Sequence, residues 1–283
     1  MIILISIKKV PFKGAACALV TPFSAGQVDF DSLGVLIDRQ MAGKTAALAV
    51  CGTTGEAPAL SVEEYRSVVE FTVSRVSHRI PVIAGAGGST TKRAAEFANI
   101  AAELGADALL AVTPYYNKAS EDGLVMHYTE IAGAGLPVIL YNVPSRTGMN
   151  IPMRAYRRLA EVENIWAVKE ASGDMKTGLD LAYELGGRFA LYSGCDELNL
   201  PLLSVGYDGF ISVTSNIVPE DMALLWSLWT GGDASAALEL DRRLYPLTKS
   251  LFTEVNPIPV KAALAKLGLC RNELRLPLSP IDI

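Results

Sequence analysis

The sequence has few of the residues from which metal sites and disulfide frameworks are built. Its 283 residues include 4 cysteines, which lie far apart and form no Cys-x-x-Cys pair, and 2 histidines, His78 and His127. This spacing assembles no zinc-like ligand set, and both histidines fall in helical patterns, where they complete no Ser-His-Asp relay. We therefore expect no metal and no serine-hydrolase chemistry, and we expect reduced thiols in a cytoplasmic protein.

The sequence also lacks a basic tract and a long apolar run. The 25 Lys and Arg residues are scattered along the chain and the formal net charge is −5, which argues against a nucleic-acid partner. The apolar start, Met1–Lys9, is too short to span a bilayer, and its lysines follow the apolar residues instead of preceding them. We expect neither export nor a membrane anchor.

What the sequence does contain is a regular alternation of strand and helix patterns. With 50% hydrophobic residues and no linker, the chain suits a single large core. Amphipathic segments such as Ser61–His78, which opens with a capping-box pattern, separate apolar segments that read as strands. The predicted strands are Ala15–Pro22, Ala46–Cys51, Pro81–Gly85, Ala106–Thr113, Pro137–Asn142, Ile165–Lys169, Phe189–Ser193 and Gly209–Thr214.

Eight such units predict an α/β fold, a (β/α)₈ TIM barrel, with an open doubly wound sheet as the alternative. After the eighth strand, the helical patterns Glu220–Thr230, Ala234–Phe252 and Pro257–Leu267 exceed what one barrel unit needs. We predict a barrel over residues 1–219 and a C-terminal helical layer over residues 220–283, packed on the barrel as a single catalytic unit.

A lysine interrupts one of the apolar strands. Lys169 follows the run Ile165–Val168, and an ammonium group is costly to bury. Burial favours the neutral amine, which is a nucleophile toward carbonyl carbon, as Schiff-base chemistry requires. The alternative is a lysine that reaches solvent at the strand end or pairs with Glu170.

Other strands also end in polar clusters. Tyr141 and Arg146 follow one strand, the loop Gly52–Glu56 with its two threonines follows another, and Tyr115-Tyr116 follows a third. In a TIM barrel the carboxyl ends of the strands carry the active site, so these groups are expected to meet there. The loop 52–56 is followed by no Gly-Lys-Ser/Thr, so it is no P-loop. The motif Gly85–Thr90 has threonine where a nicotinamide-binding motif has glycine at its sixth position, and no acidic residue follows at the correct place.

Taken together, these motifs resemble the pyruvate-dependent Schiff-base family of dihydrodipicolinate synthase and N-acetylneuraminate lyase. The resemblance runs from about Gly14 to Pro280. It is carried by Gly52–Glu56, Tyr115-Tyr116, Tyr141–Gly148, Val168–Ser172, Ile211–Asn216 and Asn256–Lys261.

The resemblance implies that Lys169 attacks the ketone of pyruvate, and that no cofactor is needed beyond this covalent imine. It implies a proton relay of Thr53, Tyr141 and Tyr116, in which Tyr116 reaches the site of a neighbouring subunit. The implied binding groups are Thr54 with backbone N–H groups for the pyruvate carboxylate, Arg146 for the second substrate, and the backbone carbonyls of Gly194 and Ile211.

Arg146 decides the choice within the family. The synthases use an arginine after Tyr-Asn-Val-Pro-Ser to bind a carboxylate, which suits a bidentate guanidinium, whereas the sugar-acid lyases usually lack it. The resemblance therefore implies condensation of pyruvate with L-aspartate semialdehyde, in diaminopimelate and lysine biosynthesis. It also implies a homodimer that shares the site through Tyr116, and a homotetramer built from two such dimers. The alternatives are a 2-keto-3-deoxy sugar-acid aldolase and a catalytically silent ligand-binding paralogue.

The resemblance also bears on regulation. In lysine-inhibited members, histidines, an asparagine and a glutamate hold the effector at the dimer interface, and the matching positions here are Val62, Tyr65, Ser89 and Arg93. An arginine in place of the acid exchanges attraction for repulsion of the lysine ammonium. We predict an enzyme that is insensitive to L-lysine.

Overall fold

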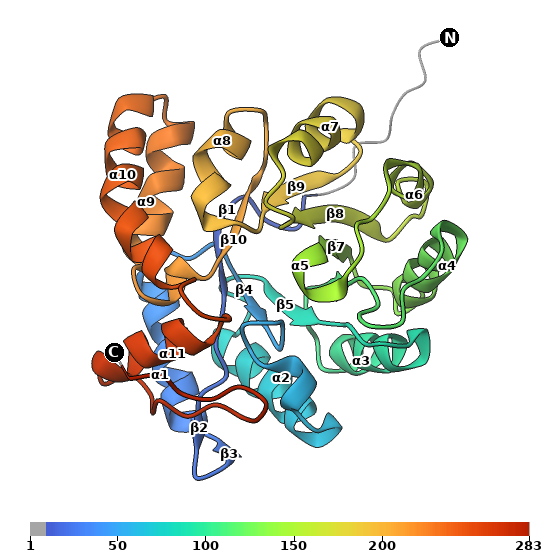
Figure 1. Ribbon diagram of the computed structural model, residues 1–283. Coiled ribbons are helices and arrows are strands. Elements are labelled where there is room, and N and C mark those ends of the chain that lie inside the picture. Colours follow the sequence, from blue (N-terminus) through green and yellow to red (C-terminus); the bar gives the residue numbers. More distant parts are fainter. Residues whose placement is uncertain (1–9, 283) are drawn as a thin grey trace.

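The computed structural model describes residues 10–282, and within them eight parallel strands close into a barrel (Figure 1). The closed order β1-β10-β9-β8-β7-β6-β5-β4 confirms the predicted TIM barrel and excludes the open sheet. The apolar start Met1–Lys9 lies outside the described residues. The barrel strands are β1 (Gly14–Ala18), β4 (Ala47–Val50), β5 (Val82–Gly85), β6 (Ala108–Val112), β7 (Val138–Asn142), β8 (Ile165–Glu170), β9 (Ala190–Ser193) and β10 (Gly209–Ser212).

Helices form a ring around the strands, and each predicted amphipathic segment is helical (Figure 1). The Ser61 cap is a full capping box, in which Ser61 and Glu64 satisfy each other's backbone N–H groups. No helix in residues 10–282 is long and apolar enough to cross a membrane. The helices are α1 (Phe30–Ala42), α2 (Val62–Val76), α3 (Thr91–Glu103), α4 (Glu121–Ala132), α5 (Pro144–Thr147), α6 (Met153–Leu159), α7 (Met175–Leu185), α8 (Asn199–Leu203), α9 (Pro219–Thr230), α10 (Ala234–Ser250) and α11 (Ile258–Lys266).

The alternation of side chains along each strand produces two separate cores. Outward residues such as Val168 pack against the helix ring, whereas inward residues such as Ala167 and Ile139 form a smaller cluster inside the barrel. Within this inner cluster, the ring of Phe12 stacks on Tyr192 with 4.2 Å between ring centroids. The barrel interior is thus packed with side chains.

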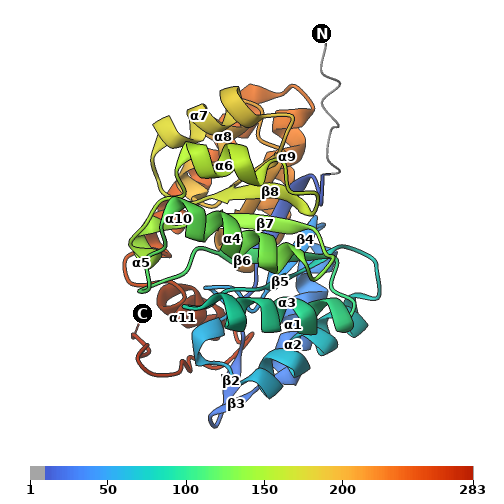
Figure 2. The same ribbon diagram turned by 90° about the vertical axis from the view of Figure 1, so that its right-hand side faces the viewer.

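The C-terminal helices cover one side and one end of the barrel. Helix α9 contacts β1, and α10 packs on α9. Figure 2 shows α11 on the same side of the barrel as the short helix α5, which follows the carboxyl end of β7. The division of the chain after residue 219 stays a proposal, in which α9, α10 and α11 form the helical extension.

Candidate active site

The carboxyl ends of β7 and β8 bring a phenol and an amine together inside the barrel. Tyr141 and Lys169 are register partners on the neighbouring strands, and both are inward by the alternation that places Ile139 and Ala167 in the inner cluster. The Lys169 Nζ lies 4.5 Å from the centroid of the Tyr141 ring. Lys169 is only 5% exposed, so the amine stands in an enclosed site beside a group that can exchange protons.

The same alternation turns Glu170 to the opposite face of the strand, so the expected alternative of a Lys169–Glu170 pair is wrong. The carboxylate of Glu170 accepts hydrogen bonds from Asn142 Nδ2 at 2.9 Å and from the Ser172 backbone N–H at 2.6 Å. Burial raises the pKa of Glu170, while these hydrogen bonds act against the shift. Within residues 10–282, Lys169 forms no ion pair with any carboxylate.

The side chain of Lys169 leaves room only for a glycine at position 194, which follows β9. A Cβ atom at this position would lie 2.8 Å from Lys169 Cε and 2.6 Å from the Cβ of Ala171. Only glycine therefore leaves room for the lysine to extend into the barrel mouth. Ile211 lies on β10 in the inner cluster and is 1% exposed. The carbonyl roles expected for Gly194 and Ile211 stay predictions.

The loop after β4 holds the two threonines between two residues with left-handed backbone. These residues are Cys51, with φ of 51°, and Glu56, with φ of 54°, rather than the glycines of the motif. Thr53 lines a cavity at the barrel mouth, whereas Thr54 is buried and its Oγ1 accepts a hydrogen bond from Asn256 Nδ2 at 2.9 Å. The hydroxyl proton of Thr54 is thereby left for another acceptor.

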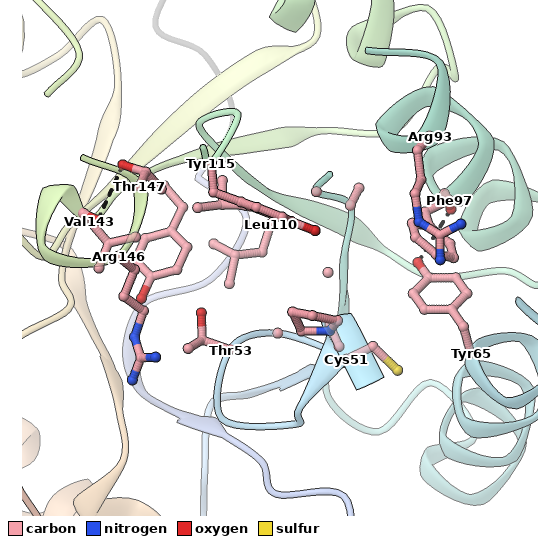
Figure 3. A pocket seen from close by; sticks show the side chains of 18 residues that line it. Cys51, Thr53, Tyr65, Arg93, Phe97, Leu110, Tyr115, Val143, Arg146 and Thr147 are labelled. Carbon is pink, nitrogen blue, oxygen red and sulfur yellow. Dashed lines mark hydrogen bonds between the residues drawn. The ribbon is translucent and has the colours of Figure 1, made fainter. Parts of the chain in front are cut away.

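The cavity has a volume of about 370 Å³, enough for small organic substrates. Figure 3 shows Thr53 and Arg146 toward one end, and Tyr65, Arg93 and Phe97 at the other. The lining residues are Cys51, Gly52, Thr53, Ala57, Pro58, Tyr65, Gly85, Ala86, Gly87, Arg93, Phe97, Leu110, Val112, Tyr115, Tyr141, Val143, Arg146 and Thr147.

Arg146 lies on α5, which positions its guanidinium beside the cavity. The Nη2 atom donates to the backbone carbonyl of Asn256 at 2.7 Å, and no carboxylate of the described residues forms an ion pair with Arg146. The remaining N–H groups are free to bind a carboxylate from a ligand.

Tyr116 is not brought into this cavity, although its neighbour Tyr115 lines it. Its side chain is 96% exposed and its backbone φ is 66°, a conformation that is unfavourable for a bulky side chain. The other seven predicted residues cluster at the carboxyl end of the barrel. The reach of Tyr116 into a neighbouring subunit stays a prediction.

A comparison with known proteins agrees with this geometry. The model of the dihydrodipicolinate synthetase family matches residues 11–283. The chain belongs to this family. A member named 4-hydroxy-tetrahydrodipicolinate synthase, from Thermodesulfovibrio yellowstonii, is 49% identical over 94% of this chain and 92% of its own length.

Solved structures of dihydrodipicolinate synthase family members share the fold. The enzyme from Aquifex aeolicus superposes with a TM-score of 0.93 at 43% identity, covering 96% of this chain and 93% of its own. The enzyme from Cyanidioschyzon merolae, solved with lysine bound, superposes with a TM-score of 0.92 at 37% identity and covers 96% and 94%. The resemblance inferred from the motifs is confirmed over nearly the whole chain.

Sequence reasoning assigned no role to Asn256, Glu56 or Lys261, which the structure places around the loop 52–56. A signal was available for Lys261, because it stands among apolar residues in Ile258–Leu264, as Lys169 does in its strand. No local signal marks Asn256, since its contacts are to residues more than 100 positions away.

Proposed function

We propose that the chain is a 4-hydroxy-tetrahydrodipicolinate synthase, a lyase that condenses pyruvate with L-aspartate semialdehyde through an imine on Lys169. One observation carries the mechanism: a buried lysine, with no ion-pair partner among residues 10–282, stands beside Tyr141 at the barrel mouth. The names of the family members at 43–49% identity support the choice of substrates. The reaction uses no cofactor, because the lysine imine itself serves as the electron sink, and we place it in the cytoplasm.

In the first step, the neutral amine of Lys169 attacks the ketone carbon of pyruvate. The ketone oxygen takes up two protons, one from the attacking nitrogen and one delivered by the relay, and leaves as water. The nitrogen keeps its second proton, which yields the iminium. Tyr141 lies 4.5 Å from the amine, measured to its ring centroid, and is suited to carry these protons. Thr53 at the cavity wall and Tyr116 of a second subunit complete the proposed relay to solvent.

In the second step, the iminium draws electrons from the methyl carbon, which loses a proton and becomes a nucleophile. This carbon attacks the aldehyde carbon of the second substrate and forms the new carbon–carbon bond. The amino group of the same substrate then replaces Lys169 at the imine carbon, which closes a ring and frees the enzyme. The pyruvate carboxylate rests on Thr54 and the neighbouring backbone N–H groups, with the carbonyls of Gly194 and Ile211 lining the site.

The proposed function is tested by two assays on the purified enzyme. Pyruvate with L-aspartate semialdehyde should give turnover, whereas a 2-keto-3-deoxy sugar acid should not be cleaved. Cleavage of the sugar acid without condensation would favour an aldolase of the same family. The absence of both activities, with pyruvate still bound, would favour a silent ligand-binding paralogue.

Replacement of Arg146 by alanine should weaken the binding of the second substrate and leave the binding of pyruvate nearly unchanged. A carboxylate that loses a charge-assisted pair forfeits about 1.5–3 kcal/mol, so the KM for aspartate semialdehyde should rise roughly 10- to 100-fold. The pyruvate KM should change by less than about threefold, because Lys169 and Thr54 hold that substrate. Steady-state kinetics with each substrate varied in turn measures both values.

The matched variant is Arg146→Lys, which keeps the positive charge and loses the bidentate fork. Its aldehyde KM should lie between those of the wild type and Arg146→Ala. Equal increases of both KM values in Arg146→Ala would remove this assignment and reopen the aldolase alternative.

L-lysine at millimolar concentrations should leave the activity unchanged. The end of the cavity opposite Arg146 carries Tyr65 and Arg93, and the Arg93 guanidinium lies 4.7 Å from the Phe97 ring centroid. A fixed cation there repels the ammonium of lysine, so little free energy is available to couple its binding to catalysis. An inhibition series measures the effect. Arg93→Glu, which restores an acid, should gain sensitivity, and saturable inhibition of the wild type would contradict the prediction.

A further inference from the structure

The loop that carries the two threonines contacts a segment that lies about 200 residues further along the chain. The loop 52–56 receives contacts from the segment 256–261, which opens α11. Both segments belong to the motifs of the family resemblance, yet the mechanism above assigns a role only to Thr53 and Thr54. The contacts that join them are made by buried side chains.

Asn256 contacts two proposed substrate groups at once. Its side-chain Nδ2 donates to Thr54 Oγ1 at 2.9 Å, and its backbone carbonyl accepts from Arg146 Nη2 at 2.7 Å. The residue is 7% exposed, and its Oδ1 has no hydrogen-bond partner among the described residues. Because Thr54 accepts this hydrogen bond, its hydroxyl proton is directed to a different acceptor, the position that a substrate carboxylate would take.

Glu56 and Lys261 form the second contact. The Lys261 Nζ lies 2.6 Å from Glu56 Oε1, and the two side chains are 0% and 1% exposed. The other carboxylate oxygen accepts from the Arg275 backbone N–H at 3.0 Å. Glu56 also has the left-handed backbone that ends the loop. A buried ion pair of this kind is weak evidence for stability, because desolvation opposes the attraction.

We propose that Asn256 and Lys261 are positioning residues for pyruvate, which hold Thr54 and Glu56 so that the loop 52–56 keeps the shape that binds the carboxylate. The inference rests on the proposed function, since it takes Thr54 as the pyruvate group. Neither residue touches the reacting atoms. Their effect is transmitted through the hydroxyl of Thr54 and through the fixed end of the loop.

Asn256→Ala tests the first contact. The backbone carbonyl that holds Arg146 remains, so the aldehyde KM should change by less than about twofold, whereas the pyruvate KM should rise about fivefold, as expected for one lost hydrogen bond. Asn256→Asp should raise the pyruvate KM further, because its carboxylate accepts the Thr54 proton and repels the substrate carboxylate. A merely structural residue would tolerate the isosteric aspartate at least as well as alanine.

The double variant Glu56→Gln/Lys261→Met tests the second contact without leaving a lone buried charge. Its pyruvate KM should rise about fivefold or more at an aldehyde KM within about twofold of wild type. The exposed pair Arg157–Glu184 provides the control, and Glu184→Gln should change neither KM. If the double variant fails to fold, the Asn256 series decides alone.

The result that overturns the inference is a pyruvate KM within about twofold of wild type in Asn256→Ala and Asn256→Asp, or an equal rise of both KM values. Borohydride trapping of pyruvate on the wild-type enzyme is measured in parallel. Trapping with unchanged KM values refutes the positioning role alone, whereas an enzyme that traps no pyruvate refutes the proposed function.

Discussion

Lys169→Ala and Lys169→Met should abolish turnover and covalent labelling while leaving the protein folded. Treatment of the wild type with pyruvate and borohydride should add one reduced pyruvate to the peptide that contains Lys169, because reduction fixes the imine as a stable amine. Loss of the nucleophile should lower kcat by roughly 10⁴-fold or more. Intact mass and peptide mass spectrometry measure the label, and thermal unfolding measures the fold.

The fold should survive because Lys169 has no ion-pair partner in residues 10–282, so its replacement leaves no carboxylate buried without its partner. Lys169→Met also keeps most of the side-chain volume next to Gly194, which limits the cavity that alanine would leave. Lys176→Ala is the matched control, since Lys176 is exposed and pairs with Asp180 on α7. A label that persists in Lys169→Met, or a wild-type peptide that stays unlabelled, would contradict the imine mechanism.

The barrel was predictable because its signal is local. Each predicted strand overlaps one strand of the closed barrel, since buried parallel strands are continuous apolar runs. Lys169 was found for the same reason: an amine stands out within such a run. The side to which it points also follows from the two-residue period, which sends Lys169 inward and Glu170 outward to Asn142.

The supporting residues were not predictable in the same way. Asn256 contacts Thr54 and Arg146 because the fold brings the start of α11 beside the loop 52–56 and α5, and nothing near Asn256 in the sequence indicates that proximity. The left-handed residues of the loop 52–56 are also not its glycines, because Cys51 and Glu56 adopt that conformation. A left-handed glutamate is tolerated here because the Lys261 pair, 205 residues away, holds it in place.

The conformation of Tyr116 is not offset by packing of its side chain within residues 10–282. A positive φ costs a bulky residue on the order of 1 kcal/mol, and a ring that is 96% exposed gains no packing to offset that cost. Its neighbours do fix the turn, because the backbone N–H groups of Asn117 and Lys118 bond to the carbonyls of Tyr115 and Tyr116. A turn that holds an aromatic side chain away from its own chain is suited to contact a second copy.

Mixed subunits should therefore regain activity that each parent variant lacks. Tyr116→Phe and Lys169→Ala homo-oligomers should both be impaired, but a dimer of one chain of each has one site with an intact Lys169 and the partner subunit's Tyr116. Random mixing makes half of the dimers mixed, each with one working site of two, so about a quarter of wild-type activity should return. Refolding or subunit exchange, followed by the steady-state assay, measures the recovery.

A second mixture distinguishes a Tyr116 that acts in the partner subunit's site from a Tyr116 that acts in its own chain's site. When wild type is mixed with the double variant Tyr116→Phe/Lys169→Ala, a shared site makes every mixed dimer inactive, so only wild-type dimers contribute and about a quarter of all sites work. If Tyr116 served its own chain, every wild-type chain would keep its site and about half would work, and the first mixture would recover nothing. That pair of results would show that the exposed tyrosine has no part in the neighbouring site. The shared arrangement requires instead that dilution to monomers removes activity even though every chain keeps its own Lys169 and Tyr141.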